Sequence, residues 1–128
     1  MAVPASGAGY QLDALRNLKG PFLTCRAAVP SMRKAGGGSI VNVTSTNAYS
    51  GWPNLFAYST AKGGLLTMTR NLARGLAADR IRANALNPGW VISDNEIRIQ
   101  AGDGHDLAWL ADAGKRQPLG RQQTPDDS

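Results

Sequence analysis

Two side chains that can move a proton stand four residues apart, Tyr58 and Lys62. On a helix, residues at this spacing project from adjacent turns on the same side, so the phenol and the ammonium would lie together. A phenol normally titrates near pH ~10, and a nearby ammonium favours its ionised form. The pair is therefore suited to acid/base chemistry closer to neutral pH, although such a spacing also arises by chance.

A serine hydroxyl precedes this pair in the chain, at Ser45. It closes residues 39–45, which are β-branched and apolar at nearly every other position, a pattern that predicts a buried strand of a parallel sheet. Ligands of open α/β sheets bind at the carboxyl ends of the strands. Ser45 is therefore placed to hydrogen-bond a substrate oxygen while Tyr58 transfers the proton.

The chain before this strand is expected to be helical. Residues 1–11 are rich in small residues without a clear period and are interpreted as a loose leader. An apolar periodicity over residues 12–34 predicts a helix, which we expect to bend at Gly20-Pro21 and to fray near Pro30.

The chain after Ser45 continues the alternation. A helix is predicted over residues 55–78 and a strand over 81–87, with a short helix around 107–113 and a loose end over 114–128. Helix, strand, helix and strand in turn indicate an α/β fold with a doubly wound parallel sheet.

The sequence closely resembles the short-chain dehydrogenase/reductase (SDR) family over roughly residues 12–125. The resemblance rests on the YxxxK motif with small residues inside it, a serine at the family's distance before that motif, the Pro-Gly pair after the next strand, and a helix asparagine ahead of the serine: Tyr58 to Lys62, Ser45, Pro88-Gly89 and Asn17. Four independent placements that agree make chance a poor explanation.

The resemblance implies a role for each residue. Tyr58 would be the general acid/base, and Lys62 would bind the nicotinamide ribose and favour the Tyr58 phenolate. Ser45 would orient the substrate oxygen, and Asn17 would hold a water that relays protons to Lys62. The cofactor-binding residues would be Tyr58, Lys62, Pro88, Gly89, Val91 and Ser93. The implied reaction is hydride transfer between NAD or NADP and an alcohol or ketone, for which the cofactor supplies the hydride chemistry.

Part of the family pattern is not found. Relatives are longer and open with a strand and a glycine-rich turn that binds the cofactor pyrophosphate. Ser6-Gly7-Ala8-Gly9 holds a single GxG without a preceding apolar strand. We therefore expect residues 12–128 to be the catalytic-half fragment of a single Rossmann-like domain, its central-to-C-terminal part, truncated at the N-terminus and also at the C-terminus.

An incomplete core rarely offsets the conformational entropy of the chain, so the fragment is expected to be marginal alone or to depend on association. The resemblance implies a homo-oligomer in the full-length form, paired through residues 12–34 and 55–78. It also places a mobile substrate lid over residues 94–114. The alternative hypothesis is a non-catalytic fragment that survives only as a helix-pairing remnant.

Composition argues against other classes of function. The net charge of +5 comes from 14 Lys and Arg against 9 Asp and Glu, but the basic residues are scattered and lack interleaved aromatics, so no nucleic-acid partner is expected. No apolar run is long enough for a membrane span. The single Cys25 cannot form an internal disulfide, which favours a cytoplasmic protein. His105 has no second metal ligand near it, so no metal site is predicted.

Overall fold

The computed structural model describes residues 7–127. The chain divides into two compact units, Met1–Asn87 and Pro88–Ser128. Among the described residues, no helix is both long and apolar enough to cross a membrane. Part of the predicted leader, residues 1–6, lies outside the described range.

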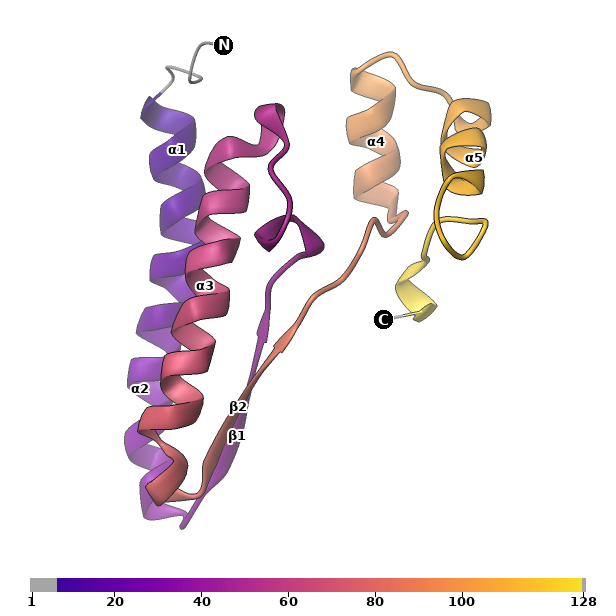
Figure 1. The fold of residues 1–128 in the computed structure, drawn as a ribbon. Helices are drawn as coiled ribbons and strands as arrows, with labels where there is room; N and C mark the ends of the chain where they lie inside the picture. The colour runs from indigo at the N-terminus through magenta and orange to yellow at the C-terminus, as the bar shows by residue number, and fades with distance from the viewer. Residues whose placement is uncertain (1–6, 128) are drawn as a thin grey trace. The chain divides into compact units, whose positions relative to one another are not determined.

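The first unit opens with one long helical rod, seen at the left of Figure 1. It consists of α1 (Gly7–Ala14), a π-helical turn η1 (Leu15–Lys19) and α2 (Gly20–Lys34). The prediction of a loose leader was therefore wrong over residues 7–11. The physical reason is tertiary: α1 packs along α3, and the ring of Tyr10 lies 6.4 Å from that of Phe56.

The predicted irregularity is present, but as a change of helix type just before Gly20-Pro21. The Gly20 N–H donates to the carbonyl of Leu15, five residues earlier, and Pro21 has no N–H to donate. The predicted fraying at Pro30 was wrong, since α2 continues to Lys34. Val29, beside Pro30, is buried in the core, and Met32 packs against that core, so burial holds the last turn in place.

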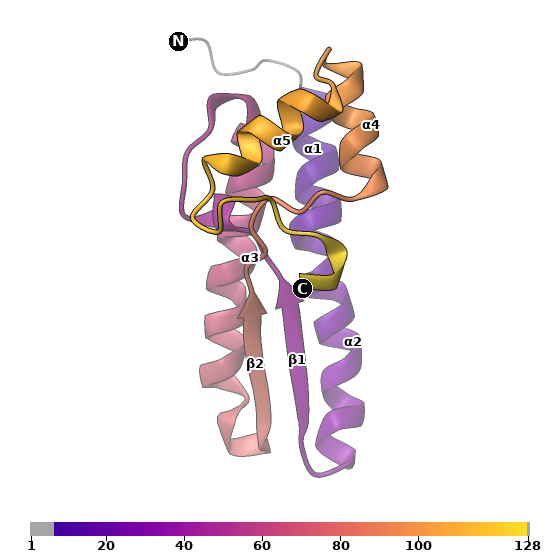
Figure 2. The ribbon, with the colours of Figure 1, turned by 90° about the vertical axis from the view of Figure 1, so that its right-hand side faces the viewer.

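The two predicted strands are confirmed. β1 (Gly38–Val43) and β2 (Ile81–Leu86) pair in parallel, in a register that runs from Gly38 opposite Ile81 to Val43 opposite Leu86. Figure 2 shows both arrows pointing the same way. They are connected by α3 (Phe56–Gly75) and a 3₁₀ turn, η4 (Ala77–Asp79), so the prediction of an α/β fold with a parallel sheet is confirmed.

The turn into β1 explains one of the three consecutive glycines. Gly37 has a φ of 147°, which L side chains rarely adopt, and a Cβ atom there would lie 2.8 Å from the carbonyl oxygen of Arg80. Glycine thus lets the start of β1 approach the residue that precedes β2.

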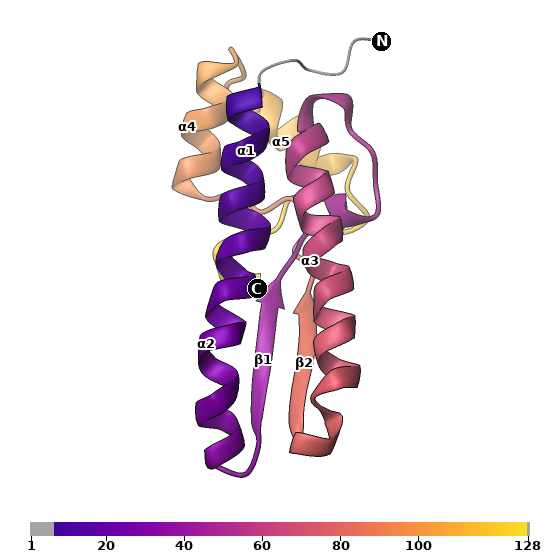
Figure 3. The same ribbon diagram turned by 90° about the vertical axis from the view of Figure 1, so that its left-hand side faces the viewer.

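The core lies between the sheet and helices α2 and α3, which cover the same face of the sheet (Figure 3). Side chains alternate along β1: Ile40 and Asn42 are buried, while Val41 and Val43 are exposed. The buried cluster comprises Cys25, Val29, Ile40, Leu76, Ile81 and Ala83.

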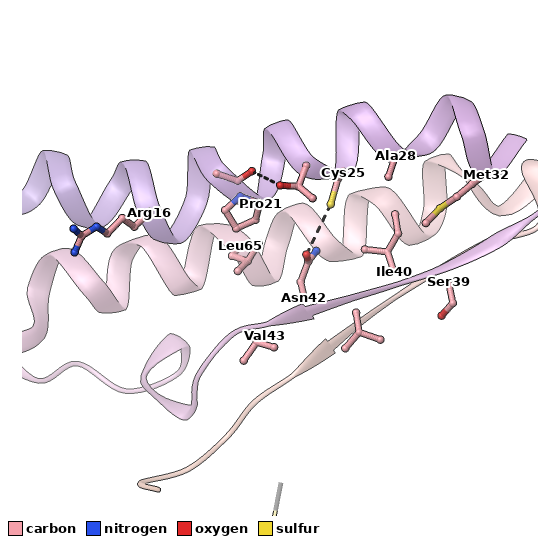
Figure 4. Close-up of a pocket in the computed structure, with 13 residues that line it drawn as sticks. Arg16, Pro21, Cys25, Ala28, Met32, Ser39, Ile40, Asn42, Val43 and Leu65 are labelled. Carbon is pink, nitrogen blue, oxygen red and sulfur yellow. Dashed lines mark hydrogen bonds between the residues drawn. The ribbon is translucent and has the colours of Figure 1, made fainter. Parts of the chain in front are cut away.

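A polar link runs through this core and ties three elements together. In Figure 4 the thiol of Cys25, on α2, meets the side-chain oxygen of Asn42, on β1. The Asn42 amide nitrogen donates to the Thr69 hydroxyl at 2.9 Å, and that hydroxyl donates to the carbonyl of Leu65 at 2.8 Å, both on α3. A buried amide whose groups are bonded fixes the register between helices and strand.

The second unit holds two short helices, α4 (Asp94–Gly102) and α5 (Leu107–Lys115), and a 3₁₀ turn, η5 (Pro125–Asp127). The helix predicted around 107–113 is confirmed as α5. The prediction of a loose end over 114–128 was wrong for residues 121–127, because the guanidinium of Arg121 pairs with both carboxylate oxygens of Asp127 at 2.7 and 2.9 Å.

Candidate active site

Lys62 reaches from α3 to the carboxyl end of β1. Its ammonium donates a hydrogen bond of 2.9 Å to the carbonyl of Val43, the last residue of that strand. The same ammonium lies 5.6 Å from the centre of the Tyr58 ring, one helical turn earlier. Lys62 is half-buried, and loss of hydration lowers its pKa from the ordinary value of 10.5. The amine is therefore bonded to the end of β1 and lies near the ring of Tyr58.

Ser45 follows the same strand by two residues and is only 7% exposed. Its hydroxyl oxygen accepts a hydrogen bond of 3.1 Å from the N–H of Asn47. Through this bond Ser45 caps the start of a 3₁₀ turn, η2 (Thr46–Ala48). This turn packs against α3, where Gly63 faces the carbonyl of Ala48. The oxygen of Ser45 is thus fixed by its own turn, and its hydrogen remains to be donated.

Thr44, between β1 and Ser45, holds the ends of both strands. It is 2% exposed, its N–H donates to the carbonyl of Leu86 at 2.7 Å, and its hydroxyl contacts that carbonyl and the side-chain oxygen of Asn87. Sequence reasoning missed this residue, because a threonine at a strand end gives no signal beyond its β propensity.

Asn17 lies in the π-helical turn η1, where its side-chain amide donates to Asp13 at 3.0 Å. The turn packs against α3: a Cβ atom at Gly64 would lie 3.1 Å from a methyl group of Leu18. Asn17 is therefore held in a turn alongside the part of α3 that follows Lys62.

Gly64 was not singled out from the sequence, although a signal existed. Glycine inside a helix costs ~1 kcal/mol relative to alanine, so two in succession, Gly63-Gly64, suggest that something packs closely on that side.

The four remaining predicted site residues, Pro88, Gly89, Val91 and Ser93, fall in one short segment of the second unit. Gln123 holds this segment: its side-chain oxygen accepts from the Gly89 N–H at 3.2 Å, and its carbonyl accepts from the Ile92 N–H at 2.7 Å. Val91 and Gln123 form an isolated parallel bridge. Gln123 gave no signal in the sequence, since it stands far along the chain from Gly89, in a polar stretch.

Comparison with known proteins supports one family. Residues 4–128 match the family described as enoyl-(acyl carrier protein) reductase. A probable galactose dehydrogenase of Rhizobium meliloti is 37% identical over 116 residues, covering 87% of this chain and 42% of that protein. Dehydrogenase/reductase SDR family member 4 of Bos taurus is 48% identical over 75 residues, covering 59% of this chain and 27% of that protein.

A crystal structure of a Beutenbergia cavernae protein with NADP bound at low occupancy superposes with a TM-score of 0.85 at 30% identity, covering 97% of this chain and 48% of that one. The chain thus spans less than half the length of these relatives. The structural match confirms the prediction of a partial Rossmann-like α/β fold. Together with the family match over nearly the whole chain, it establishes that the chain belongs to the short-chain dehydrogenase/reductase family of oxidoreductases.

Proposed function

We propose that this chain provides the proton-transfer half of an NAD(P)-dependent oxidoreductase that interconverts a small-molecule alcohol and its ketone. The observation that supports this most directly is the position of the Lys62 ammonium. It donates to the carbonyl of Val43 and lies 5.6 Å from the centre of the Tyr58 ring.

Tyr58 is the general acid/base in this proposal. In the direction of ketone reduction, its O–H gives a proton to the substrate oxygen as the carbon accepts a hydride, and in alcohol oxidation the phenolate takes the proton back. The Ser45 oxygen accepts from the Asn47 N–H, so its hydrogen points elsewhere and is proposed to be donated to the same substrate oxygen.

Lys62 and Asn17 complete the proton path. An ammonium has three N–H donors, and Val43 uses one of them, so two remain for the ribose hydroxyls of a nicotinamide nucleotide and for a water. Asn17, in the turn that packs on α3, is proposed to hold that water. A proton lost from Tyr58 would then be replaced from solvent through Lys62.

The second unit is proposed to supply the nicotinamide side through Pro88, Gly89, Val91 and Ser93. The Ser93 hydroxyl suits a nicotinamide amide, because its oxygen accepts from the Glu96 N–H and its hydrogen is left for donation. The Gly89 N–H is already bonded to Gln123, so Gly89 would contribute the shape of the segment and not a donor. When bound, NAD or NADP supplies the hydride, and the protein supplies orientation and proton transfer. The Beutenbergia cavernae relative is described as NAD(P) dependent and its crystal structure holds NADP, so NADPH and NADH are both used as probes.

A second candidate function is supported by exposed apolar side chains on the helices. A groove on the first unit is lined mainly by apolar residues of the first helical rod together with Met68 of α3. Tyr10, Leu15 and Phe22 in this groove are 45–50% exposed. A second copy of the chain would cover them, so we propose homo-oligomerisation through this helical face, either alongside catalysis or, in a non-catalytic fragment, in its place.

The free thiol of Cys25 fits a reducing, cytoplasmic setting.

Cofactor titration tests the primary proposal. Nicotinamide fluorescence should change as the chain is titrated into NADH or NADPH, and Tyr58→Phe should retain binding while losing turnover of a secondary alcohol at least ~100-fold, as loss of a general acid/base predicts. Tyr49→Phe, which alters an exposed tyrosine, is the matched control and should change neither quantity. Absence of binding at millimolar cofactor, in a chain that sediments as a dimer, would favour the helix-pairing alternative.

A further inference from the structure

Glu96 accepts two hydrogen bonds that the proposed chemistry does not explain. One carboxylate oxygen receives the indole N–H of Trp90 at 2.7 Å and the side-chain amide N–H of Gln100 at 2.9 Å. The other end of the Gln100 amide lies 2.9 Å from Nδ1 of His105. Since the Gln100 nitrogen faces Glu96, its oxygen faces the imidazole, and Nδ1 of His105 must carry the hydrogen.

Aromatic contacts close this chain of bonds into a loop. The imidazole of His105 stacks on the indole of Trp109, with centroids 3.7 Å apart and planes 5° from parallel. The indole of Trp109 in turn meets that of Trp90 edge to face, at 6.1 Å and 67°. Edge-to-face and stacked pairs are favourable geometries. Trp90 is therefore fixed both by its N–H and by its ring.

Glu96 also holds a second residue of the same segment. Its backbone N–H donates to the hydroxyl oxygen of Ser93 at 3.2 Å, at the first turn of α4. The Ser93 hydrogen is left as a donor, and a hydroxyl whose oxygen already accepts a bond is a stronger donor. One residue thus fixes Trp90 through its side chain and Ser93 through its backbone, on either side of Val91.

We propose that Glu96 is a positioning residue for the nicotinamide-binding segment, residues 88–93. Its carboxylate sets the place of Trp90 and thereby the shape of the backbone between Gly89 and Ser93, without touching the cofactor. The inference rests on the proposed function, since it assigns Glu96 to the segment that the proposal gives to the cofactor. It also joins that segment to α4 and α5, because Gln100, His105 and Trp109 belong to the same loop of contacts.

Variants of the full chain test this inference through two separate readouts. The first is the Kd for NADPH, measured by nicotinamide fluorescence. Glu96→Ala should weaken binding about tenfold, as expected for loss of a hydrogen bond to a charged group, whereas Glu96→Gln, which keeps an acceptor oxygen, should stay within about threefold of wild type. Asp94→Ala removes an exposed carboxylate from the same helical turn and should change the Kd less than twofold.

The second readout is the indole N–H resonance of Trp90 by NMR, identified by its absence in Trp90→Phe. Glu96→Ala should shift this resonance, and Glu96→Gln should largely restore it. Trp90→Phe removes the donor, so it should weaken NADPH binding by a similar factor, and the double variant should bind no more weakly than either single one. Trp90→Phe also serves as the second test if Glu96→Ala fails to fold.

Three results would overturn the inference. An unchanged Trp90 resonance in Glu96→Ala would refute the hydrogen bond itself. A shifted resonance with wild-type NADPH affinity, or losses that add in the double variant, would refute the positioning role while leaving the proposed function intact. Failure of the wild-type chain to bind NADPH would refute the proposed function, and this inference with it.

Discussion

The close approach of Leu18 to Gly64 makes a sharp prediction, because the neighbouring Gly63 provides a matched control. Both glycines lie inside α3, so replacing either by alanine should gain the same helix propensity, ~1 kcal/mol. Only their surroundings differ. A Cβ atom at Gly63 would meet the carbonyl of Ala48 at 3.7 Å, an ordinary contact, whereas at Gly64 it would lie 3.1 and 3.4 Å from the two methyl groups of Leu18.

We therefore expect Gly63→Ala to raise the free energy of unfolding by about 0.5–1 kcal/mol. In Gly64→Ala the same gain is opposed by overpacking, which typically costs about 1–3 kcal/mol, so the variant should be neutral or up to ~2 kcal/mol less stable. The difference between the two variants, about 1–3 kcal/mol, isolates the clash with Leu18. Equilibrium unfolding in urea, followed by circular dichroism, measures both.

A third variant identifies the clashing partner. Leu18→Ala removes both methyl groups, so it should cost less in the Gly64→Ala background than in the wild type, by ~1 kcal/mol or more. If Gly64→Ala is as stabilising as Gly63→Ala, and Leu18→Ala costs the same in both backgrounds, then η1 does not pack on α3 at this point. The placement of Asn17 beside α3 would be refuted with it.

Three further predictions concern the core, the ammonium and the C-terminal turn. Thr69→Val leaves the buried Asn42 amide without its acceptor and should cost about 1–3 kcal/mol in urea unfolding, whereas Thr69→Ser keeps the hydroxyl and should cost only ~0.8 kcal/mol for one methyl group. Burial lowers the pKa of Lys62 from 10.5, so as the pH rises the folded state loses this proton before the unfolded state does. The free energy of unfolding of the wild type, relative to Lys62→Met, should therefore rise as the pH is raised toward 10.5, which thermal melts measure. Hydrogen bonds from Arg121 and Thr124 hold the pKa of Asp127 well below its ordinary 3.8. The Thr124 amide, which donates to the Asp127 carboxylate, should therefore be protected against hydrogen exchange at neutral pH and lose that protection as the pH falls below 3.8. In Asp127→Asn the protection should be weak at every pH.

The elements with a strong local period could be predicted from the sequence. β1, β2, α3 and α5 were found within a few residues of their observed bounds, because alternation and helical spacing are properties of short segments. The start of α1 could not be found in this way, since residues 7–11 have no apolar period and are helical through contact with α3. The continuation of α2 past Pro30 is likewise decided by burial of its neighbours.

Helix α4 was missed although the sequence contains its start signal. Ser93 and Glu96 stand three residues apart, the spacing of a capping box, and the Ser93 hydroxyl does accept from the Glu96 N–H. The weak apolar pattern of the segment hid this signal. A search for caps independent of periodicity would have located both α4 and the residue that we propose to position the cofactor segment.

For the candidate site, too, the sequence predicts what depends on local spacing and does not predict what depends on tertiary contacts. The spacing of Ser45, Tyr58 and Lys62 could be recognised because strand and helix geometry place residues at fixed separations. The contacts that hold these residues could not, because Val43, Gln123 and the methyl groups of Leu18 are ordinary residues whose role depends on which backbone comes near them.

Thr44 is one such residue, because its hydrogen bonds join the end of β1 to the end of β2. It precedes Ser45, and its backbone and side chain both reach the last residues of the first unit, Leu86 and Asn87. The point where the chain leaves β1 toward the serine is therefore tied to the point where it leaves β2 toward Pro88. Because Lys62 is bonded to Val43, immediately before Thr44, the ammonium, the serine and the exit from β2 are all fixed to two consecutive residues of one strand end. The proposed proton-transfer site depends on the pairing of β1 with β2, so loss of that pairing would displace all three groups together.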